Sequence, residues 1–139
     1  MKISNKIKIS IRKLAEKHNL KLVILFGSQV SGKIHNKSDI DIAVLHKKNT
    51  TNFDIYSELV TGFSKIFPNN EIDLTFINRA DPLLLSNICK HTFLIYGNKH
   101  DLNKLKIYSF KRFIDYQPYL KMESNFVDKF LSRSIYANR

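Results

Sequence analysis

Apolar residues along this chain recur with two periods, one typical of helices and one typical of strands. The helical period appears in 4–18, from Asn52 to Phe67, after Asp81-Pro82 and from His100 to the end. Between these segments, shorter apolar runs predict strands at Leu20–Phe26, Asp39–Leu45, Glu71–Ile77 and Thr92–Tyr96. This order of segments predicts an α/β domain built on one sheet of four or five strands.

The first and third predicted strands differ in their patterns. Leu20–Phe26 is almost continuously apolar, which suits a central strand covered on both faces. Glu71–Ile77 alternates, so that Glu71, Asp73 and Thr75 fall on one face and apolar residues on the other. We expect the helices to cover one face of the sheet and a functional site to lie at an edge where strands end.

The predicted helices carry three specific expectations. The aromatic residues of 52–67, Phe53 and Tyr56 among them, should belong to the core. His18, at the end of the first helix, should be solvated. Pro118 should kink or break the last helix.

The last helical segment carries apolar residues in two stripes. The first contains Leu102, Leu105, Phe110, Phe113 and Ile114, and the second contains Phe126, Val127, Phe130 and Leu131. Two interpretations stay open for this segment. It packs on its own sheet, or it forms a partner-binding surface, for which its tyrosines (Tyr108, Tyr116 and Tyr119) are suited.

The candidate chemistry gathers around two short motifs. Gly27-Ser28 ends the first apolar strand, and Asp39-Ile40-Asp41 begins the second. Asp39 and Asp41 lie on one strand face, where two carboxylates repel each other unless a cation lies between them. If the third strand pairs beside the second, Asp73 joins them. Such a carboxylate set facing a small turn suits metal-dependent phosphoryl or nucleotidyl transfer.

Gly27-Ser28, ten residues and then Asp39-Ile40-Asp41 resemble the signature of the minimal nucleotidyltransferases, in the polymerase-beta-like superfamily. Asp73 stands where that family carries its third carboxylate. The resemblance covers roughly residues 10–97 and, more weakly, the helical tail. It implies an α/β (α+β) fold with a mixed, mostly antiparallel sheet of four to five strands and flanking helices.

The resemblance also implies roles for these residues. Ser28 and the backbone of Gly27 would hold the triphosphate of ATP. Asp39 and Asp41 would bind two Mg²⁺ ions, and Asp73 would complete the site for the metal nearer the nucleophile and help to deprotonate it. The implied reaction transfers AMP from ATP to a hydroxyl.

Among these enzymes, the chain resembles most the antitoxin member of HEPN/MNT toxin–antitoxin pairs. Members of that group adenylylate a tyrosine of a HEPN ribonuclease toxin and so neutralise it. Little chain follows the catalytic core to build an acceptor pocket, which favours a protein acceptor. Two alternatives stay open: an antitoxin that only masks its toxin, and an enzyme acting on a small molecule or an RNA end.

Composition sets outer limits on these interpretations. We expect a single domain over 1–139, with a core at about 4–98 and a helical tail at about 99–139. The chain has no apolar run long enough to cross a membrane and no signal peptide, so we expect a cytoplasmic protein. Its one cysteine, Cys89, excludes an internal disulfide framework and a cysteine metal cluster.

Charge is uneven along the chain, whose formal net charge is +11. Residues 38–103 carry six basic and eight acidic residues, whereas the segments on both sides are basic. A basic surface suits ATP, RNA or an acidic protein. Base-composition bias explains it equally well, since Lys, Ile and Asn are abundant together, so charge alone does not establish nucleic-acid binding.

Overall fold

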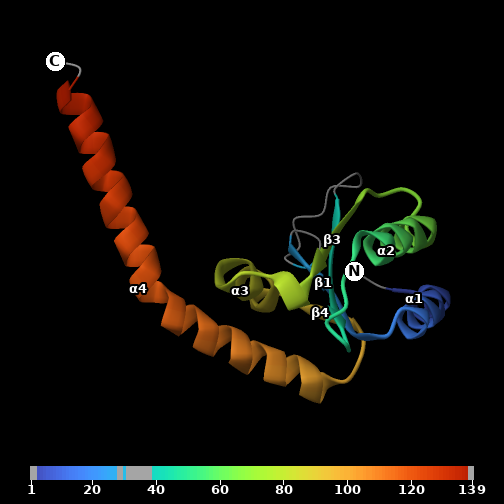
Figure 1. Ribbon diagram of the computed structural model, residues 1–139. Coiled ribbons are helices and arrows are strands. Elements are labelled where there is room, and N and C mark those ends of the chain that lie inside the picture. The colour runs from blue at the N-terminus through green and yellow to red at the C-terminus, as the bar shows by residue number, and fades with distance from the viewer. Residues whose placement is uncertain (1–2, 28–29, 31–38, 138–139) are drawn as a thin grey trace.

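The computed structural model describes residues 3–27, 30 and 39–137. In chain order the elements are α1 (Asn5–Lys17), β1 (Leu20–Phe26), β2 (Ile40–His46), α2 (Phe53–Ile66), β3 (Ile72–Phe76), the 3₁₀ helix η2 (Ile77–Arg79), α3 (Pro82–Lys90), β4 (Phe93–Tyr96) and α4 (Lys99–Ala137). Figure 1 shows the sheet with helices on both sides and α4 extending away from it. The predicted helices and strands are therefore confirmed within the described residues, with small shifts at their ends.

Four helices, α1 to α4, begin at side chains that cap them. The side chains of Ser4, Asn52, Asp81 and Asn98 each accept a hydrogen bond from the backbone N–H three residues on, at 3.3, 2.9, 2.8 and 2.8 Å. These bonds satisfy N–H groups that have no partner within the helix. After α1, Asn19 adopts a left-handed φ of 53°, which lets the chain turn directly into β1.

The four strands form one sheet in the order β3-β2-β1-β4. β1 is antiparallel to both of its neighbours, and β2 is parallel to β3. The predicted mixed, mostly antiparallel sheet is confirmed. The parallel pair means that β2 and β3 both begin at the same edge of the sheet.

Helices cover both faces of this sheet, so the expectation of a single covered face is wrong. On one face α1 and α2 pack through Ile11, Leu59 and Phe63 against alternate residues of the central strands. On the other face α3 and α4 bury a second cluster, which includes Leu85, Ile88, Leu102 and Leu105. Figure 1 shows the helices on the two faces. The continuous apolar pattern of β1 follows from this arrangement, since its residues face the two clusters in turn.

Several single positions also differ from expectation. Phe53 is 78% exposed and Tyr56 is 37% exposed, so neither belongs to the core, although Phe63 on the same helix is fully buried. His18 is buried rather than solvated, with its Nε2 3.6 Å from Glu58 Oε2. In the first stripe of α4, Leu102 and Leu105 are buried, but Phe110 and Ile114 are exposed.

α4 runs without interruption for 39 residues and contains Pro118. Figure 1 shows the helix changing direction about half-way along, towards the side on which α3 lies. A proline in a helix removes one backbone hydrogen bond and clashes with the preceding turn, which accounts for a bend. The prediction of a kink is confirmed, and the prediction of a break is not.

None of the helices in the described residues is long and apolar enough to span a membrane.

Candidate functional site

The parallel pair of strands brings the predicted aspartates to one edge of the sheet. In the register of β2 and β3, Asp41 lies directly opposite Asp73. Asp39 immediately precedes β2. The predicted pairing of the second and third strands, on which the convergence of the carboxylates depended, is therefore confirmed.

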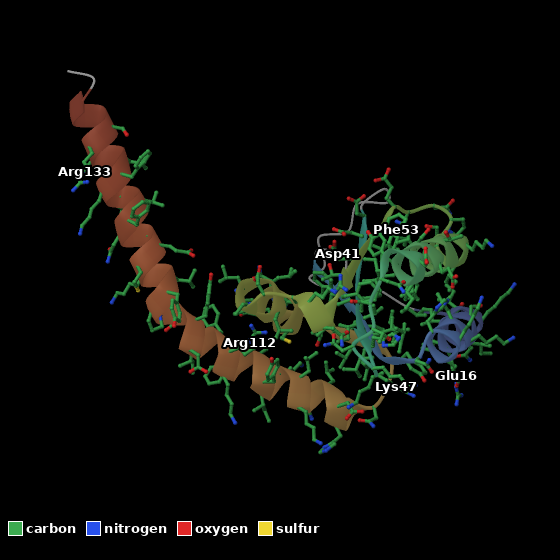
Figure 2. All side chains as sticks on the ribbon, viewed as in Figure 1. Glu16, Asp41, Lys47, Phe53, Arg112 and Arg133 are labelled. Atoms are coloured by element: carbon green, nitrogen blue, oxygen red, sulfur yellow. The ribbon has the colours of Figure 1, made fainter. Side chains whose placement is uncertain are left out.

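The two faces of β2 separate the core from the carboxylates. Ile40 and Ile42 are fully buried in the cluster formed with α1 and α2. Asp41 lies between them in sequence and so points to the opposite face, where it is half-buried. Figure 2 shows Asp41 at one end of β2 and Lys47, just beyond the strand, at the other.

Gly27 closes the site from the side of β1. Its φ is +80°, in the left-handed region that side chains disfavour. A Cβ at this position would lie 3.1 Å from Cγ of Asp41 and closer still to Oδ2. The sequence predicted a close backbone approach at Gly27, and the structure shows that one group making this approach is the Asp41 carboxylate.

The electrostatics of the site favour a cation. Burial, followed by the negative charges of Asp73 and Asp39, raises the pKa of the Asp41 carboxyl. The ion pairs found among the described residues involve none of these three aspartates. The site therefore carries negative charge that the described side chains leave uncompensated.

The donor set fits Mg²⁺ when part of the coordination comes from a substrate. In the described part of the chain, no group of three or more His, Cys, Asp or Glu side chains is gathered closely enough to hold a metal ion. Mg²⁺ is commonly bound through one or two carboxylates together with water and phosphate oxygens. Carboxylates paired across β2 and β3 can supply that share of the ligands.

Ser28, the predicted partner of the triphosphate, lies outside the described residues. The described part of this turn contains one further contact, in which the Val30 N–H donates to the Gly27 carbonyl over 3.2 Å. The role of Ser28 accordingly stays a prediction.

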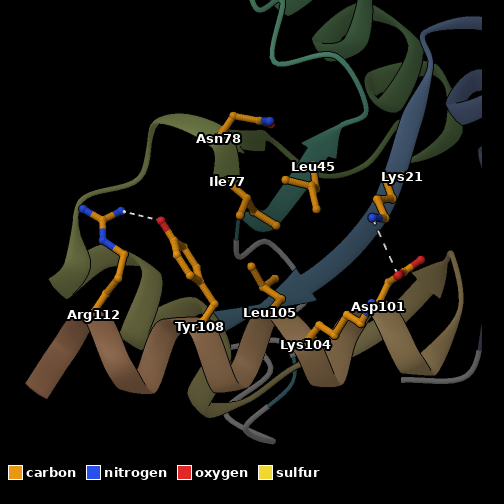
Figure 3. A pocket seen from close by; sticks show the side chains of 9 residues that line it. All are labelled: Lys21, Leu45, Ile77, Asn78, Asp101, Lys104, Leu105, Tyr108 and Arg112. Carbon is orange, nitrogen blue, oxygen red and sulfur yellow. Dashed lines mark hydrogen bonds and ion pairs between the residues drawn. The ribbon is translucent and has the colours of Figure 1, made fainter.

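A separate cavity of about 300 Å³ lies at the opposite end of the sheet. Figure 3 shows it between α4, η2 and the ends of β1 and β2 that lie away from Gly27 and Asp41. At its rim Lys21 Nζ lies 3.7 Å from Asp101 Oδ1, and the Arg112 guanidinium lies over the Tyr108 ring. The Lys21–Asp101 ion pair joins the first half of α4 to β1, whereas Arg112 and Tyr108 both belong to α4. None of the predicted site residues that the structure describes lines this cavity.

Comparisons with known proteins agree with this geometry. Residues 8–101 match the family model described as Polymerase beta, Nucleotidyltransferase. A protein adenylyltransferase MntA of Aphanizomenon flos-aquae (strain 2012/KM1/D3) is 29% identical over 101 residues, covering 67% of each chain.

Solved structures resemble nearly the whole chain. One chain of a crystal structure of a toxin–antitoxin with AMP-PNP matches with a TM-score of 0.72 and 25% identity, over 89% of this chain and 98% of its own. A second match comes from tri-AMPylated Shewanella oneidensis HEPN toxin in complex with MNT antitoxin, with a TM-score of 0.68 and 21% identity. It covers 93% of this chain and 99% of the other, and it shows the likeness of the fold alone.

Proposed function

Since the chain belongs to the polymerase beta nucleotidyltransferase family, we propose that it is a Mg²⁺-dependent protein adenylyltransferase acting as an antitoxin. Its acceptor is a tyrosine hydroxyl of a cognate HEPN ribonuclease toxin, and its AMP donor is ATP. The observation that carries this proposal is the pairing of Asp41 with Asp73 beside the left-handed Gly27. The 29% identical MntA relative and the AMP-PNP-containing toxin–antitoxin structure support the choice of donor and acceptor.

Asp39 and Asp41 would hold two Mg²⁺ ions, with Asp73 as a further ligand on the side of the nucleophile. When bound, Mg²⁺ neutralises charge that develops on the phosphates and lowers the pKa of a coordinated hydroxyl. The Gly27 backbone and Ser28 would hold the triphosphate of ATP at the end of β1. The metal ions and the triphosphate would thus lie together at the edge of the sheet where β2 and β3 begin.

In the proposed reaction the tyrosine oxygen attacks the α-phosphorus of ATP. A new oxygen–phosphorus bond forms, and the bond from the α-phosphorus to the oxygen bridging the β-phosphate breaks, releasing pyrophosphate. The phenolic proton passes to Asp73 or to water. Asp73 is exposed at the rim of the site, where a protein acceptor can reach it.

The test is to incubate the protein with ATP labelled on the α-phosphate, Mg²⁺ and the cognate HEPN toxin. Label on a tyrosine of the HEPN protein, lost in Asp41→Asn, supports the proposal. Full neutralisation of the toxin by Asp41→Asn without transfer of label would instead show masking. Label that appears only on RNA or on a small molecule would refute a protein acceptor.

A further inference from the structure

The second half of α4 leaves the rest of the protein. From residue 121 to residue 134 every residue is exposed, although this part of α4 is helical throughout. Figure 1 shows the segment projecting beyond α3 into open space. The interpretation that this segment packs on its own sheet is therefore wrong for residues 121–134.

One side of this projecting helix is mostly apolar, although by helical spacing Glu123 and Arg133 fall on the same side. At 100° per residue, a set of large apolar side chains falls within about half of the helix circumference. Its members are Tyr119, Met122, Phe126, Val127, Phe130 and Leu131, which are 50–70% exposed. The opposite half carries Lys121, Ser124, Asn125, Asp128 and Ser132. We call the first set the tail face.

The tail face is too large to be an ordinary surface feature. Isolated apolar residues are normal on protein surfaces, but a contiguous patch of several hundred Å² marks an interaction site. Six such side chains, each more than about half exposed, leave on the order of 600 Å² uncovered. One partner in a standard protein–protein interface contributes about 800 Å². The tail face therefore supplies most of one side of an interface.

The tail face continues the side of α4 that already packs on the protein. Leu102 and Leu105 face the body, and by helical spacing Val127 and Leu131 lie on the same side of the helix. A partner seated on the tail face would thus extend the layer of α3 and α4. The bend in α4, which contains Pro118, turns its second half towards the side of α3 (Figure 1).

Charge indicates which kind of partner fits. α4 carries eight Lys or Arg and four Asp or Glu residues, of which three and two lie in the projecting residues 121–134, and the whole chain has a formal net charge of +11. Two copies of this chain would bring like charges together, which disfavours self-association. A helix with an apolar stripe, on a partner whose net charge is negative, would be complementary in both respects.

We propose that the tail face docks a helix of the HEPN toxin, an inference that rests on the proposed function and extends it. The contact holds the acceptor protein by a surface separate from the aspartates, so that affinity for the toxin and the transfer of AMP depend on different residues. An isolated helix of this length is only marginally stable in water, so the contact also stabilises the tail.

The test compares two double variants of the full chain that add the same charge to opposite sides of the helix. Phe126→Asp/Phe130→Asp alters the tail face, and Asn125→Asp/Ser132→Asp is the matched control. The Kd for the HEPN toxin is measured by calorimetry, and the KM for toxin and the kcat by transfer of labelled AMP. Because the changed positions are exposed, both variants should keep the wild-type Tm of the body.

For the tail-face variant we expect Kd and KM to rise about 100-fold, as for loss of two central aromatic anchors, with kcat little changed. The control variant should stay within about threefold of wild type in Kd and KM. An unchanged Kd and KM in the tail-face variant would overturn the proposal. A chain that sediments as a dimer when alone and as a monomer with the tail-face substitutions would also overturn it.

Failure of the proposed function gives a different result. If wild type binds the toxin but labels nothing, the enzymatic proposal fails, while the effect of the tail-face substitutions on Kd still decides the docking proposal. Asp41→Asn should bind the toxin with wild-type Kd, because Asp41 lies in the sheet and not on the tail face.

Discussion

Replacing Gly27 by alanine should separate the stability of the fold from the geometry of the site. Gly27 has a φ of +80°, so an alanine there would have to adopt a left-handed conformation, in which its Cβ costs about 1–2 kcal/mol. For a chain of this size, that corresponds to a fall in Tm of roughly 4–8 °C. The same Cβ would lie 3.1 Å from Cγ of Asp41, inside the 3.4 Å at which ordinary contact begins, and nearer still to Oδ2.

The Asp41 carboxylate is the end of a side chain, so it would yield by rotating away from the new methyl group. A displacement of about 1 Å in a reacting or positioning group lowers the rate about 100-fold. We therefore expect AMP transfer by Gly27→Ala to fall about 100-fold in kcat at a temperature well below its Tm. Tm by calorimetry and kcat by transfer of labelled AMP measure the two effects separately.

Gly97→Ala is the matched control. Gly97 also has a left-handed φ, +106°, and an added Cβ would lie 2.5 Å from the Lys21 carbonyl oxygen and 2.6 Å from Leu22 Cδ2. It borders the end of β1 remote from Asp41, so its cost should appear in Tm and not in kcat. Wild-type kcat in Gly27→Ala, or an equal loss of kcat in Gly97→Ala, would refute this reasoning.

Three further predictions test the site and the core. Asp41→Asn should raise the Tm of the metal-free protein at about pH 7, because the raised pKa of Asp41 means that folding penalises its charged form. The difference in Tm between Asp41→Asn and wild type should shrink as the pH falls through that pKa, and added Mg²⁺ should raise the Tm of wild type only. Phe63→Ala should cost about 3–5 kcal/mol in urea unfolding, whereas Phe53→Ala on the same helix should cost less than about 1 kcal/mol; equal costs would place Phe53 in the core. His18 has a pKa lowered by burial, against the opposing effect of Glu58, so protonation disfavours the fold; stability should decline as the pH falls below about 6.5, and His18→Asn should show a smaller decline by thermal melting.

The site residues can be predicted from the sequence more completely than the packing around them. Alternation along β2 and β3 places Asp41 and Asp73 opposite the apolar residues of their strands, and alternation is a local property that the sequence shows directly. That the two strands are parallel neighbours depends on the path of the chain through α2. Which strands lie side by side is a tertiary property. The sequence therefore leaves the pairing of β2 with β3 as an assumption, and the structure shows it.

Periodicity also shows which side of a helix is apolar but not what lies against it. Phe53 and Phe63 belong to one predicted stripe, yet only Phe63 lies over the sheet. The same limit applies to α4, where Leu105 is buried and Phe126 is exposed on one continuous helix. The continuous apolar run of β1 by itself indicates a sheet covered on both faces, which conflicts with the expectation of a single covered face.

The pairing of Asp41 with Asp73 has a consequence for how the enzyme can be damaged. Among the described strands, β3 stands at the edge of the sheet and is bonded on one side only, to β2. A slip of one residue in its register would turn Leu74 out of the core and Asp73 into it. The apolar contacts of Leu74 with the core therefore hold Asp73 in place. Substitutions that weaken those contacts would lower activity in molecules that stay folded and keep every aspartate.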